Sequence, residues 1–156
     1  MTDSASLRQV ADELPFGVCV RHDLVSAGQP EPEQFAALAG AGLKTVVDLR
    51  HPAEPRSCDE PEAVREAGLE YINIPVAGVL TPETFDFFRE VMRDATRRPV
   101  LVHCASANRC GALLLPFFML DEGADRETAW RLALQAGLRS AELGELALTY
   151  VEQSAG

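Results

Sequence analysis

The chain has 156 residues, and its 14 Lys+Arg stand against 24 Asp+Glu, which gives a formal net charge of −10. This length predicts a single domain, residues 1–156, with residues 1–14 as a flexible or peripheral segment. A hydrophobic content of 47% is typical of a globular protein and argues against disorder. The negative charge argues against nucleic acid and against an anionic membrane surface as partners, because both attract basic proteins.

The cellular setting is predicted from the apolar stretches of the chain. Residues 1–12 are polar and do not resemble a signal peptide. The longest apolar stretch, residues 111–120, is about half of the ~20 residues that a transmembrane helix needs. We therefore expect a cytoplasmic protein, with no membrane partner, whose cysteines are free thiols in a reducing compartment.

Strand and helix patterns alternate along the chain. Strands are indicated by short β-branched and apolar stretches, and helices by Pro or a capping residue before an amphipathic stretch. In chain order, the pattern predicts strands at 18–20 and 24–27, a helix at 32–41, a strand at 45–49, a loop at 51–61, a helix at 62–67, a strand at 71–74, a helix from 82 to about 96, a strand at 99–103, a helix at about 110–120, a helix capped by Asp125 and a last helix at 141–153. This order predicts an α/β domain with a mainly parallel central sheet flanked by helices. Its binding crevice would lie at the carboxyl ends of the strands.

The sharpest motif is the segment VLVHCASANRCGA, residues 100–112, in which an apolar strand leads into His103, Cys104 and a short loop before a helix. A cysteine at a helix N-terminus lies near the positive end of the helix dipole and near free backbone N–H groups, which lower its pKa. The same N–H groups can hold an oxyanion, and Arg109 adds a planar, bidentate clamp. The residues of this cradle are Ala105, Ser106, Ala107 and Asn108.

The two main residues of the motif also have structural interpretations. Cys104 would then be a small buried hydrophobe at a strand end, and Arg109 a surface residue at a helix start. The helix dipole disfavours a cation at that position, so a functional role is the better interpretation of Arg109. The spacing of the cysteines and histidines matches no metal-ligand pattern, and we expect neither a metal nor a cofactor.

The HCASANR segment resembles the signature loop of cysteine-dependent phosphatases, in which His-Cys precedes a loop that ends in Arg. The chain is more closely similar to a bacterial phosphatase-like family of dual-specificity type, also described as beta-lactamase-hydrolase-like or as sulfurtransferase-like. The resemblance covers about residues 18–120. Three further stretches carry it: AGQPEPEQFAALAGAGLKTVVDLR (27–50), GLEYINIPV (68–76) and LTPETFDFF (80–88).

The resemblance implies a cysteine-phosphatase-like fold and a set of roles. Cys104 would attack phosphorus and form a phosphocysteine, which water then releases. Arg109 and the backbone of the loop would bind the phosphate oxygens. His103 would orient the loop and favour the thiolate. The expected partner is a small oxyanion-bearing substrate.

The loop departs from the phosphatase pattern in its length. Cysteine phosphatases usually have five residues between Cys and Arg, whereas four residues separate Cys104 from Arg109. This length resembles rhodanese-type sulfurtransferases, whose cysteine carries a persulfide. The alternative function is therefore sulfur transfer by the same cysteine, with a sulfane sulfur donor as substrate.

Two loop residues depart from the family pattern in type. Ala107 stands where the loop usually has glycine, and if this position needs a positive φ, alanine adds strain of about 1–2 kcal/mol. Cys110 stands where Ser or Thr usually eases departure of the thiolate. It is either a resolving thiol for Cys104 or a buried helix residue.

The aspartate that usually acts as general acid is absent, because Ala-Gly-Val occupies residues 77–79 after the IPV strand. Asp48, at the end of its strand, is our candidate acid, and Glu83 and Asp86 are the other nearby carboxylates. Without an acid, protonation of the leaving group is slower by roughly 10²–10⁴-fold. The missing acid leaves a third interpretation open, a non-catalytic module that binds an anion or a partner.

Two charged residues follow the strand at 45–49, near the expected site. Arg50 and Glu54 either line the site or form a structural ion pair. We include Arg50, with His103, Cys110 and the loop residues, among the candidates for substrate binding.

Overall fold

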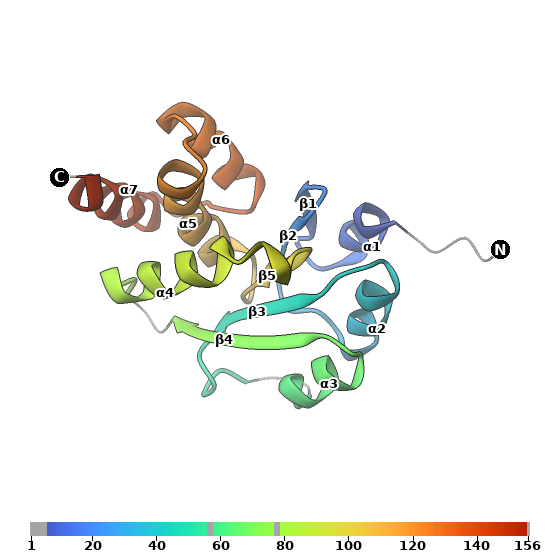
Figure 1. The fold of residues 1–156 in the computed structure, drawn as a ribbon. Helices are drawn as coiled ribbons and strands as arrows, with labels where there is room; N and C mark the ends of the chain where they lie inside the picture. The colour runs from blue at the N-terminus through green and yellow to red at the C-terminus, as the bar shows by residue number, and fades with distance from the viewer. Residues whose placement is uncertain (1–5, 56–57, 77–78, 156) are drawn as a thin grey trace.

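The computed structural model describes residues 6–55, 58–76 and 79–155, which form a sheet between two layers of helices (Figure 1). The sheet has five strands in the order β1-β2-β5-β3-β4. β2, β5, β3 and β4 are parallel to one another, and β1 is antiparallel to β2. The strands are β1 (Val18–Arg21), β2 (Leu24–Ala27), β3 (Thr45–Arg50), β4 (Glu70–Val76) and β5 (Val100–His103).

The expected α/β fold with a mainly parallel sheet is confirmed. The ends of all five predicted strands agree with the observed ends to within one or two residues. For β2, β3 and β5 the agreement has a simple cause: these strands are buried throughout, so they are continuous apolar stretches that are easy to recognise in a sequence.

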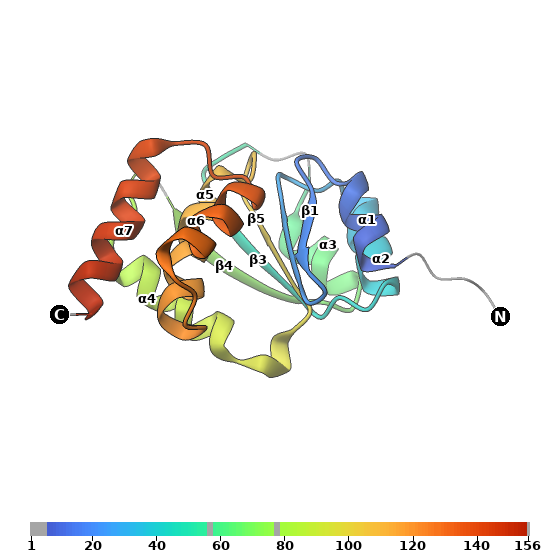
Figure 2. The ribbon, with the colours of Figure 1, turned by 90° about the horizontal axis from the view of Figure 1, so that it is seen from above.

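The helices form a separate layer on each face of the sheet (Figure 2). The first layer packs against a core of residues from the first part of the chain together with Leu101 of β5. The second layer packs against a core centred on the helix that follows β5. The first layer contains α1 (Leu7–Glu13), α2 (Pro32–Gly40) and α3 (Glu60–Glu66), and the second contains α4 (Pro82–Arg93), α5 (Asn108–Pro116), α6 (Arg126–Gln135) and α7 (Ala141–Ala155).

Alternation along the central strands assigns each side chain to one of these two cores. In β5, Val100 and Val102 belong to the core under α4–α7, whereas Leu101 belongs to the core under α1–α3. Because successive side chains point to opposite faces, His103 faces the α1–α3 layer. Asp48 is the partner of His103 in the β3–β5 register, so the two side chains lie side by side.

Part of the segment that the sequence predicted to be flexible or peripheral, residues 1–14, is helical in the structure. Leu7–Glu13 form α1, which begins with a Ser6–Gln9 capping box. Leu7, Val10 and Ala11 are buried in the core under α1–α3. The amphipathic pattern is only two turns long, which explains why it was missed.

Two other element boundaries differ from the prediction. α3 begins at Glu60, inside the predicted loop, because the Asp59 side chain caps its first turn. The helix expected over 110–120 begins at Asn108, ends at Pro116 and continues as one π-helical turn, Phe117–Asp121. Pro116 cannot donate a backbone N–H, so a change in helix geometry there is expected. In the described part of the chain, no helix has both the length and the apolar character needed to cross a membrane.

Candidate active site

The sequence motif lies at the carboxyl end of β5, between the sheet and α5. Cys104 is the first residue after the strand, and only 1% of it is exposed. Its backbone N–H donates to the carbonyl of Ala27 at 3.2 Å, so the end of β2 fixes the start of the loop. The loop then turns into α5, whose first helical residue is Asn108.

The backbone of Ala107 is left-handed, with φ of 70° and ψ of −8°. The sequence predicted strain at this position if it required a positive φ, and the structure confirms that it does. For a residue with a Cβ, this conformation costs about 1–2 kcal/mol relative to the right-handed one. The loop therefore has the turn that glycine usually provides, but with a methyl group on it.

Contacts from outside the loop fix the direction of its carbonyl groups. The Ala105 carbonyl accepts a hydrogen bond from the Gln29 N–H at 3.3 Å. The guanidinium of Arg139 donates to the Ser106 carbonyl at 2.9 Å and to the Ser106 hydroxyl at 3.0 Å. The side chain of Asn108 accepts from the backbone N–H of Arg139 at 2.8 Å. The loop is thus braced from β2 on one side and from the turn between α6 and α7 on the other.

The surroundings of Cys104 favour its thiolate. They lower its pKa from 9.0 to about 5. The largest cause is a hydrogen bond from the Cys110 thiol, whose Sγ lies 3.8 Å from the Cys104 Sγ. The backbone N–H groups of Ser106 and Cys110 and the charge of Arg109 lower it further, against an opposing effect of burial. Burial and the adjacent Cys104 raise the pKa of Cys110, which stays a neutral donor.

The carboxylate of Glu54, whose role the sequence left open, holds the guanidinium of Arg109. Its Nη1 and Nη2 donate to the two oxygens of Glu54 at 3.0 and 3.1 Å, and Nη1 also donates to the Val76 carbonyl at 3.0 Å. The hydrogen bond from Arg109 is the largest cause that lowers the pKa of Glu54 to about 2. Glu54 is therefore ionised and holds the plane of the guanidinium.

Arg50 contacts Glu54 and so supports the carboxylate that holds Arg109. Its Nε lies 3.2 Å from a Glu54 oxygen, its Nη1 donates to Gln29 at 2.8 Å, and its Nη2 donates to the Pro55 carbonyl at 2.9 Å. Both alternatives for this pair thus apply in part: Arg50 and Glu54 form an ion pair, and that ion pair contacts Arg109. Arg50 is only 8% exposed and acts on the loop through Glu54 and Gln29.

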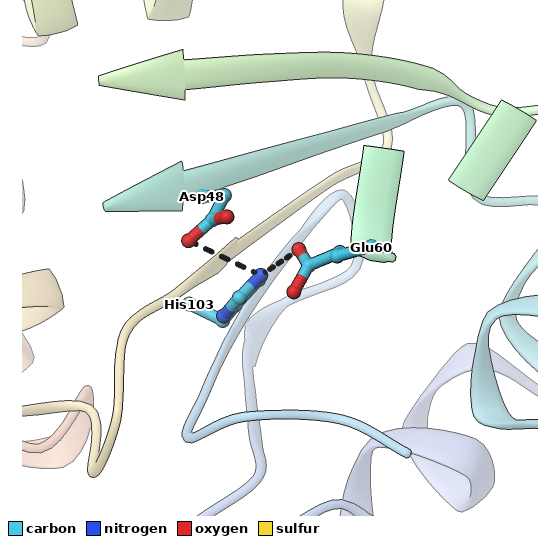
Figure 3. A group of neighbouring side chains, drawn as sticks. All are labelled: Asp48, Glu60 and His103. Carbon is cyan, nitrogen blue, oxygen red and sulfur yellow. Dashed lines mark hydrogen bonds and ion pairs between the residues drawn. The ribbon is translucent and has the colours of Figure 1, made fainter. Parts of the chain in front are cut away.

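His103 is buried beneath the loop, in a cluster of polar side chains (Figure 3). Its Nε2 lies 2.5 Å from Glu60 and 3.7 Å from Asp48, and its Nδ1 lies 3.3 Å from the Cys104 carbonyl. Burial lowers the pKa of His103, but Glu60 and Asp48 outweigh that effect and the pKa is raised. Gln29 links this cluster to Arg50, because its Nε2 donates to Glu60 at 2.6 Å.

The structure contradicts Asp48 as the candidate general acid. The carboxylate is fully buried, accepts from the Tyr71 hydroxyl at 2.6 Å and from the Arg50 backbone N–H at 2.9 Å, and lies beside His103. A general acid must reach the leaving oxygen of a substrate, whereas Asp48 faces the α1–α3 layer. The physical reason is the alternation of β3, which the strand-end position alone does not reveal.

The other carboxylates considered for the acid lie on α4. Glu83 is exposed in the first turn of that helix, and the carboxylate of Asp86 accepts a short hydrogen bond from the Tyr150 hydroxyl. Ala77 and Gly78, which occupy the place of the usual acid loop, lie outside the described residues.

Asp48, Glu60 and His103 are also the group of described residues whose ligand atoms are close enough for a metal, all within 4.8 Å of one another. The spacing of residues in the sequence gave no sign of this group. Its donor set fits an ion pair better than a cation site, because His103 Nε2 is already hydrogen bonded to Glu60. A protonated imidazole has no lone pair for a metal.

Three contributors to the site were missed by the sequence analysis. Gln29 follows β2 in the AGQP stretch and was considered only as part of the resemblance. Glu60 lies in a segment predicted to be a loop, and Arg139 lies in a turn outside the resemblance. None of the three stands near Cys104 in the chain, so only their common presence at the carboxyl edge of the sheet could have indicated a role.

A buried cysteine after a central parallel strand, with an arginine from the next helix beside it, defines the class of cysteine-phosphatase-like α/β proteins. The family model described as "DSP-PTPase phosphatase fused to NAD+ Kinase" matches residues 19–146. The chain belongs to that family. The expected relation to dual-specificity-type phosphatases is thereby confirmed.

Relatives found by sequence comparison carry one of the family descriptions expected from the sequence, beta-lactamase hydrolase-like. A "Beta-lactamase hydrolase-like protein" from Xylella fastidiosa (strain 9a5c) is 30% identical over 143 residues, which cover 88% of this chain and 32% of the relative. One from Agrobacterium fabrum is 31% identical over 113 residues, covering 69% of this chain and 25% of the relative. The chain thus spans only a quarter to a third of these relatives, and a single domain stays a prediction.

Solved structures share the fold at low sequence identity. A protein from Shewanella putrefaciens CN-32, described provisionally as a phosphatase (DUF442), aligns with a TM-score of 0.76 and 23% identity over 94% of this chain and 97% of that one. The core catalytic domain of a PP-IP phosphatase from S. cerevisiae aligns with a TM-score of 0.74 and 17% identity over 91% and 89% of the two chains.

Proposed function

We propose that the chain is a cysteine-dependent phosphatase that hydrolyses a phosphate monoester through a phosphocysteine on Cys104. The observation that carries the proposal is the depressed pKa of Cys104, about 5, in a loop that ends at a fixed arginine. At neutral pH such a cysteine is a thiolate, the reactive form of the side chain.

In the proposed first step, the Cys104 thiolate attacks phosphorus and the P–O bond to the leaving group breaks. The leaving oxygen departs as an alkoxide or phenolate and takes up a proton from the solvent. The loop N–H groups and Arg109 stabilise the charge on the transferring phosphoryl group. A guanidinium has five N–H donors, and the bonds to Glu54 and Val76 use three of them. Glu54 therefore supports the proposal by fixing the plane of the clamp while leaving donors for an oxyanion.

In the second step, water attacks phosphorus and Cys104 leaves as a thiolate again. The Cys110 thiol, 3.8 Å from the Cys104 sulfur, stabilises this leaving group by donating a hydrogen bond to it. Asp48 does not reach the leaving oxygen, and we assign the role of general acid to no other carboxylate among the described residues. We therefore expect the best rates with substrates whose alcohol is a good leaving group and needs little protonation.

The substrate is expected to be small and weakly charged. The net charge of −10 slows the approach of polyanions, although a local site can still hold one oxyanion because the field of surrounding charges is screened beyond about 10 Å. We further propose a cytoplasmic location, where thiols such as Cys104 stay reduced.

Sulfur transfer through a persulfide on Cys104 remains the second candidate, favoured by the four residues between Cys104 and Arg109.

The test is turnover of a small aryl phosphate, run beside formation of thiocyanate from thiosulfate and cyanide. We expect phosphate release by the wild type, loss of turnover in Cys104→Ser and a loss of about 10²–10³-fold in Arg109→Lys, because lysine cannot form a bidentate clamp. Cys19→Ser is the matched control, because Cys19 is a buried cysteine in the core under α1–α3. We expect this variant to retain activity.

Equal phosphate release by the wild type and Cys104→Ser would refute the phosphatase. Thiocyanate formation that requires Cys104, without phosphate release, would establish the sulfurtransferase instead. Binding of phosphate with no turnover of either substrate would identify an anion-binding module.

A further inference from the structure

A continuous chain of polar side chains connects the residue before Cys104 with the arginine at the end of the loop. Each member is hydrogen bonded to the next, at distances between 2.5 and 3.2 Å. Gln29 is the one member without an ionisable group. In order, the members are His103, Glu60, Gln29, Arg50, Glu54 and Arg109.

The side-chain amide of Gln29 has an orientation that its two neighbours in this chain determine. Its oxygen accepts from Arg50 Nη1 at 2.8 Å, and its nitrogen donates to Glu60 Oε1 at 2.6 Å. The reverse orientation would place N–H against N–H at Arg50 and oxygen against oxygen at Glu60, since a guanidinium only donates and an ionised carboxylate only accepts. The amide therefore lies between a cation and a carboxylate and bonds to both.

The two side chains that Gln29 separates are opposite in charge and removed from water. Glu60 has no exposed surface, and Arg50 is only 8% exposed. Opposite charges attract strongly in such surroundings, because the dielectric constant is lower than in water. Without the amide between them, Arg50 and Glu60 would form a direct ion pair. Arg50 would then be drawn away from Glu54, and Glu60 away from His103.

We propose that Gln29 is a positioning residue, whose side-chain amide prevents a direct ion pair between Arg50 and Glu60. The amide thereby keeps apart two ion pairs, one that orients His103 before the loop and one that supports Arg109 at its end. The inference rests on the proposed function in that it treats the loop as the oxyanion site, but it requires no turnover.

The backbone of Gln29 has a separate contact with the loop. Its N–H donates to the Ala105 carbonyl at 3.3 Å, and this bond does not involve the side chain. Substitution of the side chain therefore leaves the backbone contact in place and tests the amide alone.

His103 reports whether the two ion pairs are kept apart. Burial lowers the pKa of His103, but the hydrogen bond to Glu60 and the charges of Glu60 and Asp48 outweigh that effect and raise it. If Arg50 paired with Glu60, the carboxylate would be shared and a cation would stand nearer to the imidazole. Both changes disfavour the charged imidazole, so the pKa of His103 would fall.

The test compares two substitutions that both remove the amide but differ in length. Gln29→Ala leaves room for Arg50 and Glu60 to meet, whereas Gln29→Met keeps an unbranched side chain of similar length between them. Nuclear magnetic resonance of the imidazole nitrogens measures the pKa of His103, and calorimetric titration with inorganic phosphate measures anion binding by the loop.

We expect the pKa of His103 to fall in Gln29→Ala and to stay near the wild-type value in Gln29→Met. Phosphate should bind about 10-fold more weakly to Gln29→Ala, the effect of losing about one charge-assisted hydrogen bond, because Arg109 loses the support of Arg50 through Glu54. Gln29→Met should bind phosphate much like the wild type.

Gln34→Ala is the matched control. Gln34 is a second glutamine of the α1–α3 layer whose side chain has two hydrogen bonds, from the Glu31 N–H at 2.8 Å and to the Glu13 carbonyl at 3.1 Å. Both partners are backbone groups, so this variant should keep the wild-type pKa of His103 and the wild-type phosphate affinity. If Gln29→Ala does not fold, Gln29→Asn takes its place with the same expectations, because its amide is one carbon shorter and reaches only one of the two charges.

Three results would overturn the proposal: an unchanged pKa of His103 in Gln29→Ala, equal falls in Gln29→Ala and Gln29→Met, or wild-type phosphate affinity in Gln29→Ala. Equal falls would show that the amide has a merely structural role. A wild type that binds no phosphate would reject the proposal too, because the loop would not be an oxyanion site.

Turnover of a small aryl phosphate by the same samples separates this result from the proposed function. The expected changes in His103 and in phosphate binding, in a protein without turnover, retain the positioning role of Gln29 and reject the phosphatase. Turnover without these changes does the reverse.

Discussion

The methyl group of Ala107 lies against the backbone of Gly137, in the turn between α6 and α7. A Cβ built on Gly137 would stand 2.6 Å from the Ala107 Cβ and 2.9 Å from its carbonyl oxygen. Gly137 has a φ of +120°, a region that side chains rarely adopt. The left-handed alanine that precedes α5 is thus accommodated by a glycine that follows α6.

This contact predicts the effect of enlarging Gly137. Gly137→Ala should lower the free energy of unfolding by more than about 2 kcal/mol, because it adds both a steric clash and an unfavourable φ. Ala107→Gly in the same chain should recover only the part due to the contact between the two Cβ atoms, because the contact with the Ala107 carbonyl oxygen and the unfavourable φ both remain. A double-mutant cycle in urea measures the coupling. Strictly additive effects of the two substitutions would contradict the contact.

The second prediction concerns the pKa of Cys104, which is about 5. Because the hydrogen bond from Cys110 is the largest cause of the shift, Cys110→Ala should raise this pKa and Cys110→Ser should keep it near the wild-type value. The ultraviolet absorbance of the thiolate, taken as a difference from Cys104→Ser, measures it against pH. Identical titration curves for the alanine and serine variants would show that Cys110 does not stabilise the thiolate.

The third prediction concerns the carboxylate that clamps Arg109. Glu54→Gln should lower the free energy of unfolding by about 1–2 kcal/mol at neutral pH, since it removes a charged partner from a partly buried ion pair. The pKa of Glu54 falls from 4.5 to about 2 on folding, so its contribution is fully present above pH 4.5 and is lost as the pH falls toward 2. Chemical denaturation of both proteins at several pH values gives the comparison. A difference that grows as the pH falls would have the wrong sign.

The fourth prediction concerns the buried pair of His103 and Glu60. Glu60→Ala should destabilise the protein by about 3–5 kcal/mol, because it leaves a buried imidazolium without its partner. Glu60→Gln should cost less, since a neutral hydrogen bond can remain.

The pH dependence of this pair has the opposite sign to that of Glu54. The pKa of His103 is raised above 6.5, with Glu60 and Asp48 as the charged groups responsible. The stabilisation is therefore fully present below pH 6.5 and is lost as the pH rises through the raised pKa. Nuclear magnetic resonance of the His103 ring nitrogens measures the titration, and a pKa below 6.5 would contradict it.

The sequence by itself determined the sheet and the local part of the site. Parallel strands that are buried on both faces have a strong apolar pattern, and Cys104 and Arg109 lie on one short loop, so their proximity needs no tertiary information. The positive φ of Ala107 was raised as a possibility by the resemblance, because the family usually has glycine at this position of the loop.

The tertiary structure alone decided which distant residues act on that loop. Glu54 and Glu60 follow β3 and meet Arg109 and His103 because the sheet order places β3 beside β5. Arg139 reaches Ser106 from the turn between α6 and α7. The same order turned Asp48 from a candidate acid into a partner of His103. A one-residue change of register would move a side chain to the opposite face of the sheet, and no local pattern fixes the register between distant strands.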